Sequence, residues 1–319
     1  ALSLTATTCF ITDSGNLTVT GAAVFTTGAT GSNIELDSPS NAFAAQVTMQ
    51  ADDGSEAFGN IAFVDSAAID FATSAGSNGD LYINAGTDGA VGGNLSVTAT
   101  TGNITDTVAL AVTGTTTLVT SANDATISLD TTTNAFTGAV TITTNDASGT
   151  DADVTIDGGT TALDIAASTI DGDLTLTSGH ASGITDSGTV TVGGNFSATT
   201  DANNGVINVG TMAVDGTVAL TTNGNGAATI VNDAGVNFAA STVGGALSAT
   251  ATTGNITDTG ALTITGATTL VTSANDATIT LDTTTNAFTG AMTITTNDAS
   301  GTDADVTIDG GTPALILSL

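Results

Sequence analysis

Apolar and polar residues alternate in many short segments along this chain. In Val140-Thr-Ile142 and Leu174-Thr-Leu176, for example, two apolar residues enclose a threonine, and Gly, Asn, Asp or Ser follow within a few positions. A period of two residues is typical of a strand with one buried face. Thr, Val and Ile, which favour strands, are frequent, whereas long helix-forming residues are nearly absent. The pattern predicts an all-β protein.

These segments recur at regular intervals. Most successive segments start 22 or 23 residues apart, and two more of the same kind lie between them, such as Ile104-Thr-Asp106 and Leu110-Ala-Val112. The series starts at Leu95, Leu118, Val140, Leu174, Phe196, Val218, Leu247, Leu270 and Met292. Three short strands in every 22–23 residues, separated by polar corners, predict a parallel β-helix, or β-solenoid, of about 13 coils.

The chain also repeats over longer distances. Residues 94–161 and 246–313 align without a gap and differ at 9 of 68 positions. A diverged copy lies at the N-terminus, and a shorter one begins at Phe196. We therefore expect residues 1–319 to form a single continuous solenoid. Its sequence units are 1–93, 94–194, 195–245 and 246–319.

A solenoid explains these repeats better than a sandwich of hairpins does. Hairpins need tight turns between adjacent antiparallel strands, whereas here similar residues recur in register once per coil and would stack on one another. Inward positions carry Leu, Val, Ile and Phe, and outward positions carry Ser and Thr. Phe43, Phe136 and Phe288 recur in the same Asn-Ala-Phe setting, which predicts that they fill interior space.

The charge of the chain excludes several classes of protein. Among 319 residues there are 31 acids and no lysine or arginine, so the formal charge is −31. Without cations the chain cannot neutralise phosphates, so we expect no nucleic-acid partner and no attraction to anionic membranes. The chain contains no stretch of 18 consecutive apolar residues, so we expect no membrane insertion. Because the chain starts at Ala1, we expect a mature or excised segment of something longer.

The spacing of these motifs resembles that of large secreted bacterial β-helical exoproteins of the filamentous-haemagglutinin and two-partner-secretion type. The resemblance rests on Gly93-Asn-Leu-Ser-Val-Thr-Ala99, Gly102-Asn-Ile-Thr-Asp106 and Leu110-Ala-Val-Thr-Gly114. It covers nearly the whole chain and implies a right-handed parallel β-helix, secretion, and an adhesive or scaffolding role.

Acidic corners are the candidate metal sites. Four residues in the loop after Ile142 recur in the loop after Ile294: Asn145, Asp146, Asp151 and Asp153, and Asn297, Asp298, Asp303 and Asp305. Clustered carboxylate and amide oxygens suit Ca²⁺, although no EF-hand spacing is present. The alternative is that Asp and Asn simply favour turns. We expect no required cofactor, with Ca²⁺ as an optional ligand.

Candidate catalytic groups are few. Asp13, Asp106, Asp186 and Asp258 form an Ile-Thr-Asp series that could supply paired carboxylates for sugar hydrolysis. The same group in every unit argues against a single active site, and a sugar groove without Trp lacks stacking platforms. His180 has no repeated partner. We therefore expect no enzyme, and a polysaccharide-active enzyme is the third hypothesis.

Two surface features suggest further ligands or modifications. Outward threonines in Thr141-Ile-Thr143, Thr175-Leu-Thr177 and Thr293-Ile-Thr295 resemble the arrays of ice-binding solenoids, or simply suit strands. Asn-x-Ser/Thr sequons, which permit glycosylation, occur at Asn16, Asn94, Asn103, Asn195 and Asn255.

The leading hypothesis is an extracellular or cell-surface structural protein, a segment of a filament, sheath or adhesin stalk. Apolar residues continue through Leu315-Ile-Leu-Ser-Leu319, and a solenoid with open strand edges tends to associate. We therefore expect self-association into fibres, end to end or laterally, with surface glycans as a further candidate partner. The alternative is a calcium-dependent adhesive or ice-binding module.

Overall fold

The structure is a computed structural model that describes residues 1–51, 59–72, 80–83, 91–145, 152–297, 299, 304–312 and 314–318. It confirms the predicted fold class: a parallel all-β solenoid with about 22 residues per turn and about 13 turns, and no helix among the described residues. The chain divides into two compact units, Ala1–Thr160 and Thr161–Leu319.

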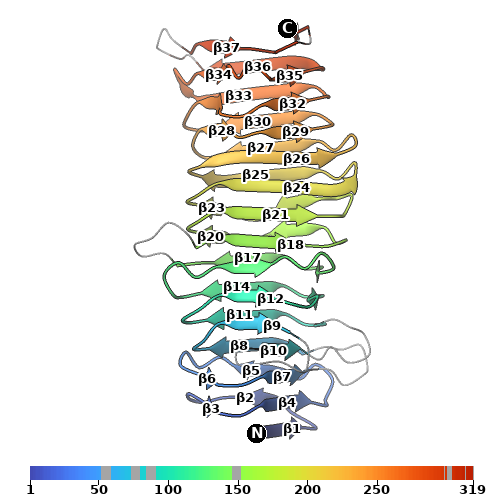
Figure 1. Cartoon of the computed structure of the whole chain (residues 1–319), viewed down its shortest axis with the longest axis vertical. Helices are drawn as coiled ribbons and strands as arrows, with labels where there is room; N and C mark the ends of the chain where they lie inside the picture. The colour runs from blue at the N-terminus through green and yellow to red at the C-terminus, as the bar shows by residue number, and fades with distance from the viewer. Residues whose placement is uncertain are drawn as a thin grey trace. The chain divides into compact units, whose positions relative to one another are not determined.

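The first unit consists of short strands joined by corner loops (Figure 1). Its strands are β1 (Leu2–Ala6), β2 (Ile11–Thr12), β3 (Thr18–Val19), β4 (Ala23–Thr27), β5 (Ile34–Leu36), β6 (Ala42–Phe43), β7 (Val47–Gln50), β8 (Ile61–Asp65), β9 (Ile69–Phe71), β10 (Asp80–Ile83), β11 (Leu95–Ala99), β12 (Ile104–Asp106), β13 (Ala111–Val112), β14 (Thr116–Thr120), β15 (Ile127–Leu129), β16 (Ala135–Phe136), β17 (Val140–Thr143) and β18 (Val154–Asp157). One face stacks β2, β5, β8, β11, β14 and β17, and a second stacks β9, β12, β15 and β18.

The second unit is built in the same way. Its strands are β19 (Leu163–Ile165), β20 (Ser168–Ile170), β21 (Leu174–Ser178), β22 (Ile184–Asp186), β23 (Val190–Val192), β24 (Phe196–Asn203), β25 (Ile207–Val214), β26 (Thr217–Asn223), β27 (Ala228–Asn232), β28 (Val236–Phe238), β29 (Ser241–Val243), β30 (Leu247–Ala251), β31 (Ile256–Asp258), β32 (Leu262–Ile264), β33 (Thr268–Asn275), β34 (Ile279–Leu281), β35 (Ala287–Phe288), β36 (Ala291–Asn297), β37 (Val306–Ile308) and β38 (Ile316–Leu317). One face stacks β25, β27, β30, β33 and β36, and another stacks β28, β31, β34 and β37.

Alternation along each strand sorts residues between core and surface. In β11, Leu95, Val97 and Ala99 are buried while Ser96 and Thr98 are partly exposed. The two outward residues bear hydroxyl groups, which solvent can satisfy, and the three inward residues remove apolar surface from water. Phe136 and its counterparts Phe43 and Phe288 are buried, as predicted for interior space-fillers.

The register between turns differs from the one that the sequence suggests. The spacing of the apolar segments places Leu118 over Leu95, but the structure pairs Leu95 with Thr116 and Val97 with Leu118. The next step in the same stack is longer, because Thr116 pairs with Val140. A threonine therefore occupies an inward position between a leucine and a valine. In the second unit, Thr268 occupies the equivalent inward position between Leu247 and Met292.

The apolar segments also do not all belong to one face. In the second unit, the segments that start at Leu174, Phe196 and Val218 stack on one another. The next segment, at Leu247, instead pairs with Ala228 on another face. The longer interval of 29 residues between Val218 and Leu247 marks this change of face.

A column of glycines lines one corner of each unit. The N–H of Gly114 donates to the carbonyl of Gly93 at 3.1 Å, and a Cβ atom on Gly114 would overlap that carbonyl. Gly138 stands in the same relation to Gly114, and Gly216 to Gly194 in the second unit. The turns approach so closely at this corner that only glycine fits.

Large apolar side chains are exposed near the first and last strands. Phe10 is 61% exposed beside the first turn, and Leu317 in β38 is 61% exposed. Leu4 and Ile316 are also exposed. Leu4 and Leu317 occupy positions that are buried in the inner turns, since Leu4 pairs with the buried Phe25 and Leu317 with the buried Met292.

Candidate functional site

Three members of the Ile-Thr-Asp series each bind a buried asparagine 28 residues later in the chain. The asparagine Nδ2 donates to the aspartate Oδ2 at 2.6 Å in all three pairs, which are Asp13–Asn41, Asp106–Asn134 and Asp258–Asn286. The asparagine belongs each time to the Asn-Ala-Phe motif. We call this arrangement the Asp–Asn connector, because it joins two consecutive turns.

The asparagine uses its other amide atom as well. Its Oδ1 accepts from the backbone N–H of the leucine four residues after the aspartate: Leu17 at 2.8 Å, Leu110 at 2.7 Å and Leu262 at 2.8 Å. The three asparagines are at most 1% exposed. From the sequence alone, a role is predicted only for the phenylalanine of Asn-Ala-Phe. The constant spacing between Ile-Thr-Asp and Asn-Ala-Phe is the signal that points to the aspartate–asparagine pair.

The carboxylate of Asp106 is itself almost enclosed. It is 8% exposed and also accepts from the backbone N–H of Asp130 at 3.0 Å. Burial raises its pKa above the ordinary value of 3.8, and the hydrogen bonds from Asn134, Thr131 and Asp130 partly oppose this rise. These donors occupy the acceptor sites of the carboxylate, which suits holding two turns together.

Asp186, the fourth member of the series, has different partners. Its carboxylate accepts from the backbone N–H of Gly210 at 2.8 Å and from both the N–H and the hydroxyl of Thr211. The sequence unit that follows lacks the middle section that contains Asn-Ala-Phe. The aspartate therefore still ties its turn to the next one, through a threonine instead of an asparagine.

The predicted calcium residues fall into two groups. Asp146, Asp151, Asp298 and Asp303 lie outside the described residues. The Nδ2 atoms of Asn145 and Asn297 donate to the carbonyls of Ser121 and Ser273, each at 2.8 Å, so both amides already connect turns. The backbone carbonyls of Asp153 and Asp305 accept from Ile127 and Ile279. Within the described ranges, no group of three His, Cys, Asp or Glu residues could hold a metal ion.

Four of the five sequon asparagines are exposed but take part in hydrogen bonds between turns. The Oδ1 of Asn94 accepts from Thr115, that of Asn103 from Thr126, and that of Asn255 from Thr278. Asn195 accepts from Thr217 and donates to Asp173. Asn16 is exposed at a corner of the first unit. The asparagine at these corners thus has a structural use, because it joins neighbouring turns.

Outward threonines form a regular row in the second unit. Thr177, Thr199, Thr221, Thr242 and Thr263 pair with one another on five consecutive turns. Other outward threonines bond a neighbouring turn, as Thr257 does to Asn237 at 3.3 Å. The threonines predicted as an array, such as Thr141 and Thr293, face outward on β17 and β36.

The comparison with protein families bears directly on this repeated chemistry. A family model described as repeats of unknown function (DUF5649) matches residues 1–50, 72–143, 151–207 and 225–295, which is well over half of the chain. The chain belongs to the DUF5649 family. No curated protein and no solved structure matches it.

Each DUF5649 segment contains one member of the Ile-Thr-Asp series. Three of the four segments contain a complete Asp–Asn connector, and the segment 151–207 contains Asp186 without an asparagine partner. The connector is therefore a recurring element of the DUF5649 repeat in this chain.

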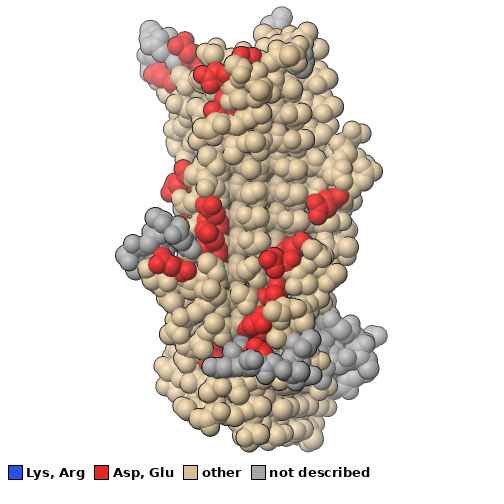
Figure 2. All heavy atoms as spheres, in the orientation of Figure 1, with Lys and Arg blue, Asp and Glu red and all other residues tan. Residues whose placement is uncertain are grey.

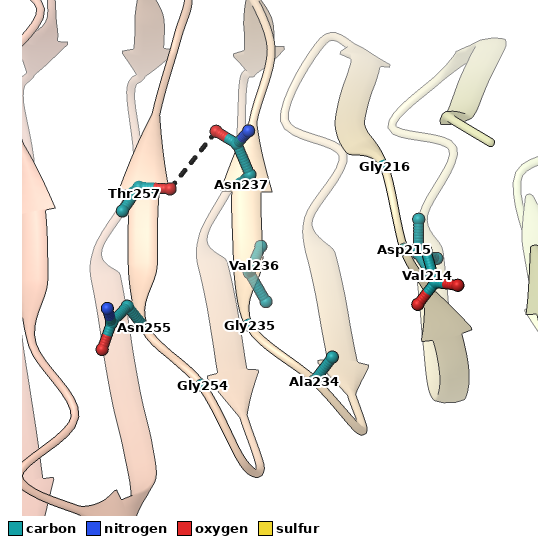
Figure 3. A pocket seen from close by; sticks show the side chains of 10 residues that line it. All are labelled: Val214, Asp215, Gly216, Ala234, Gly235, Val236, Asn237, Gly254, Asn255 and Thr257. Atoms are coloured by element: carbon teal, nitrogen blue, oxygen red, sulfur yellow. Dashed lines mark hydrogen bonds between the residues drawn. The ribbon is translucent and has the colours of Figure 1, made fainter. Parts of the chain in front are cut away.

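A shallow groove of about 320 Å³ lies on the second compact unit, Thr161–Leu319 (Figure 3). Gly216, Gly235 and Gly254 line it and leave room because they have no side chains. Its polar side chains are Asp215, Asn237, Asn255 and Thr257. Asn237 already accepts from Thr257, so few free polar groups converge there.

Acidic residues of the DUF5649 chain gather in a few groups. Figure 2 shows them in red between wide uncharged areas of the face in view. His180, the single histidine, caps a local turn, because its Nδ1 accepts from the N–H of Ser182 at 3.0 Å. The described residues contain no membrane-spanning helix.

Proposed function

We propose that this DUF5649 protein is an extracellular, non-enzymatic structural protein that forms part of a surface filament, sheath or adhesin stalk. The observation that carries the proposal is the thrice-repeated Asp–Asn connector. The buried polar groups of these connectors join one turn to the next and recur at the same place in three repeats. They are not gathered at one site. This arrangement suits resistance to extension along the stack of turns.

The strand stacks add to this argument. Consecutive turns are joined by in-register parallel ladders, such as the five residue pairs between β11 and β14. Each strand is too short to be stable alone and depends on the turns above and below it. A protein of this kind shares load over many weak bonds, which favours a mechanical role over a binding pocket.

We infer that the protein self-associates into fibres. The exposed side chains of Phe10 and Leu317 lie beside strand edges that can pair with another strand, as in end-to-end stacking. The neutral threonine faces are the surfaces available for lateral contact.

Electron microscopy of the purified chain at increasing concentration tests this proposal. We expect fibres for the wild type and shorter particles for Leu317→Asp, because a charge at an apolar edge opposes stacking. Thr141→Asp, which adds the same charge to a strand face, distinguishes lateral contact from end-to-end contact. Monodisperse single particles at all concentrations, confirmed by sedimentation, would overturn the proposal.

The threonine row favours ice binding as a second candidate function. Five side chains from Thr177 to Thr263 repeat at the spacing of neighbouring strands, about 4.8 Å, and none lies beside a basic group in this chain. Thermal hysteresis of the freezing point tests the candidate. We expect a gap between melting and freezing that Thr221→Asp reduces, and the absence of any gap in the wild type would eliminate this function.

A further inference from the structure

Asp65 is the most deeply buried carboxyl group among the described residues. It ends β8 at an inward position and is 2% exposed. The chain has no lysine or arginine that could compensate a negative charge there. An ionised carboxylate in such a place is costly, and buried carboxyl groups often remain neutral instead.

The second unit carries an asparagine at the equivalent position. Asp65 pairs with Ala99 at the end of β11, and Asn232 pairs with Ala251 at the end of β30. Ala99 and Ala251 are themselves equivalent, because they lie in the nearly identical segments 94–161 and 246–313.

The surrounding bonds and sequence support this equivalence. The carbonyl of Asp65 accepts from Thr100, and that of Asn232 accepts from Thr252, each at 2.9 Å. A phenylalanine follows six residues after each, at Phe71 and at Phe238, and both are buried.

The two side chains share one hydrogen bond and differ in the second. The Oδ1 of Asp65 accepts from the N–H of Phe43 at 3.2 Å, and the Oδ1 of Asn232 accepts from the N–H of Val214 at 2.8 Å. The Nδ2 of Asn232 also donates to the carbonyls of Val214 at 3.0 Å and Gly235 at 2.6 Å. A carboxylate has no proton to donate at this second atom, whereas a carboxylic acid has one.

We propose that Asp65 is a neutral carboxylic acid in the folded protein and donates to a backbone carbonyl at this corner, as the Asn232 amide does. The corner of the first unit then acts as a pH-sensitive latch, which loosens when Asp65 loses its proton. In the second unit the Asn232 amide makes the corresponding bonds at any pH, because an amide does not titrate.

The groups around Asp65 agree with a neutral state. On β5 and β9 the titratable residues are Glu35 and Asp70, with Asp37 just after β5, and Asp13 is reached through Asn41. All are acids, and β6, β11, β4 and β7 have no titratable residue. Burial raises the pKa of Asp65 above its ordinary value of 3.8, and the N–H groups of Phe43, Ser66 and Ala67 oppose this only in part.

The sign of the pH dependence follows from this direction. The folded state holds the proton more tightly than the unfolded state does, so the stabilisation is fully present below about pH 4. It is lost as the pH rises through the raised pKa of Asp65. Below that window the first unit is latched, and above it the corner carries a buried charge.

Exchanging the two side chains in the full chain tests the proposal. Hydrogen exchange followed by mass spectrometry gives protection factors for residues 59–72 and 226–240 of the wild type, Asp65→Asn and Asn232→Asp. We expect wild-type protection of 59–72 to fall relative to 226–240 by up to about tenfold per pH unit between about pH 4 and the raised pKa, and to level off above that pKa. Asp65→Asn should abolish this fall, and Asn232→Asp should transfer it to 226–240.

Two outcomes would overturn the proposal. One is a pH dependence of 59–72 that is the same in the wild type and in Asp65→Asn. The other is a carboxyl ¹³C resonance, assigned to Asp65 by its loss in Asp65→Asn, that titrates at or below the ordinary value. If Asp65→Asn fails to fold, the Asn232→Asp comparison still decides, because a pH dependence that does not appear in 226–240 of this variant would overturn the proposal.

Discussion

Asn134 binds Asp106 through one amide atom and the backbone N–H of Leu110 through the other. Asp106 and Leu110 lie on one turn of the solenoid and Asn134 on the next, so one side chain closes two bonds between turns. Asn286 does the same with Asp258 and Leu262 in the second unit. Because the connectors recur, their contribution to stability can be measured twice within one chain.

Removing the connector amide should be strongly destabilising. Asn134→Ala leaves the N–H of Leu110 and the carboxylate of Asp106 buried without this partner, so we expect unfolding free energy to fall by about 3 kcal/mol. Asn286→Ala should have a similar effect in the second unit. Urea denaturation followed by circular dichroism measures both.

An exposed asparagine provides the matched control. Asn16 is exposed at a corner of the first unit, and its side chain makes no hydrogen bond to another described residue, so Asn16→Ala should change stability by no more than about 0.5 kcal/mol. If Asn134→Ala is as mild as Asn16→Ala, the connector does not hold the turns together.

The sequence predicts the solenoid because its period is carried by many side chains at once. Leu95, Val97 and their counterparts repeat with polar residues between them, and this alternation identifies the strands directly. It does not determine the register. The corner between two strands can lengthen or shorten by two residues without changing which side chains face inward, and this is how Thr116 comes to lie over Leu95.

The candidate site was less accessible to sequence reasoning. The Ile-Thr-Asp series is visible in the sequence, but there its carboxylates are only candidate catalytic groups, and nothing within the series identifies the partner 28 residues away. Hydrogen bonds between turns depend on which corners stack, and that information appears only with the register. The predicted calcium loops stay a prediction, since half of their residues lie outside the described ranges.

The displaced register leads to a stabilising substitution. The hydroxyl groups of Thr116 and Thr268 are buried and, among the described residues, have no hydrogen-bond partner. Valine has nearly the same shape without the hydroxyl, so Thr116→Val and Thr268→Val should each stabilise the protein by about 1 kcal/mol. Thermal denaturation measures the change.

A neighbouring threonine gives the opposite expectation. Thr120 ends the same strand, and its buried hydroxyl donates to the carbonyl of Ala125 at 3.1 Å. Thr120→Val should therefore destabilise the protein by about 1 kcal/mol. Equal effects of Thr116→Val and Thr120→Val would show that the Thr116 hydroxyl does have a partner.

The calcium prediction can be tested by adding or removing the ion. If the loops at 145–153 and 297–305 bind Ca²⁺, the melting temperature should rise with Ca²⁺, fall again with a chelator, and respond less to Mg²⁺, which tolerates irregular oxygen sites poorly. Asp153→Asn combined with Asp305→Asn should weaken the response. A melting temperature that is unaffected by chelator and by added Ca²⁺ argues against ions in these loops.

The glycine column should tolerate no side chain. A methyl group on Gly114 would overlap the carbonyl of Gly93, to which the N–H of Gly114 donates, so the two turns would have to separate. Because both contacting groups are backbone, no rotamer change relieves the overlap, and we expect Gly114→Ala to destabilise the protein by about 2–3 kcal/mol. Gly210 is the control, since no atom lies within 4 Å of the Cβ position there. Gly210→Ala should change stability little, and urea denaturation compares the two. A similar small effect for both variants would mean that the corner adapts, and close approach of the turns would then not explain the glycine column.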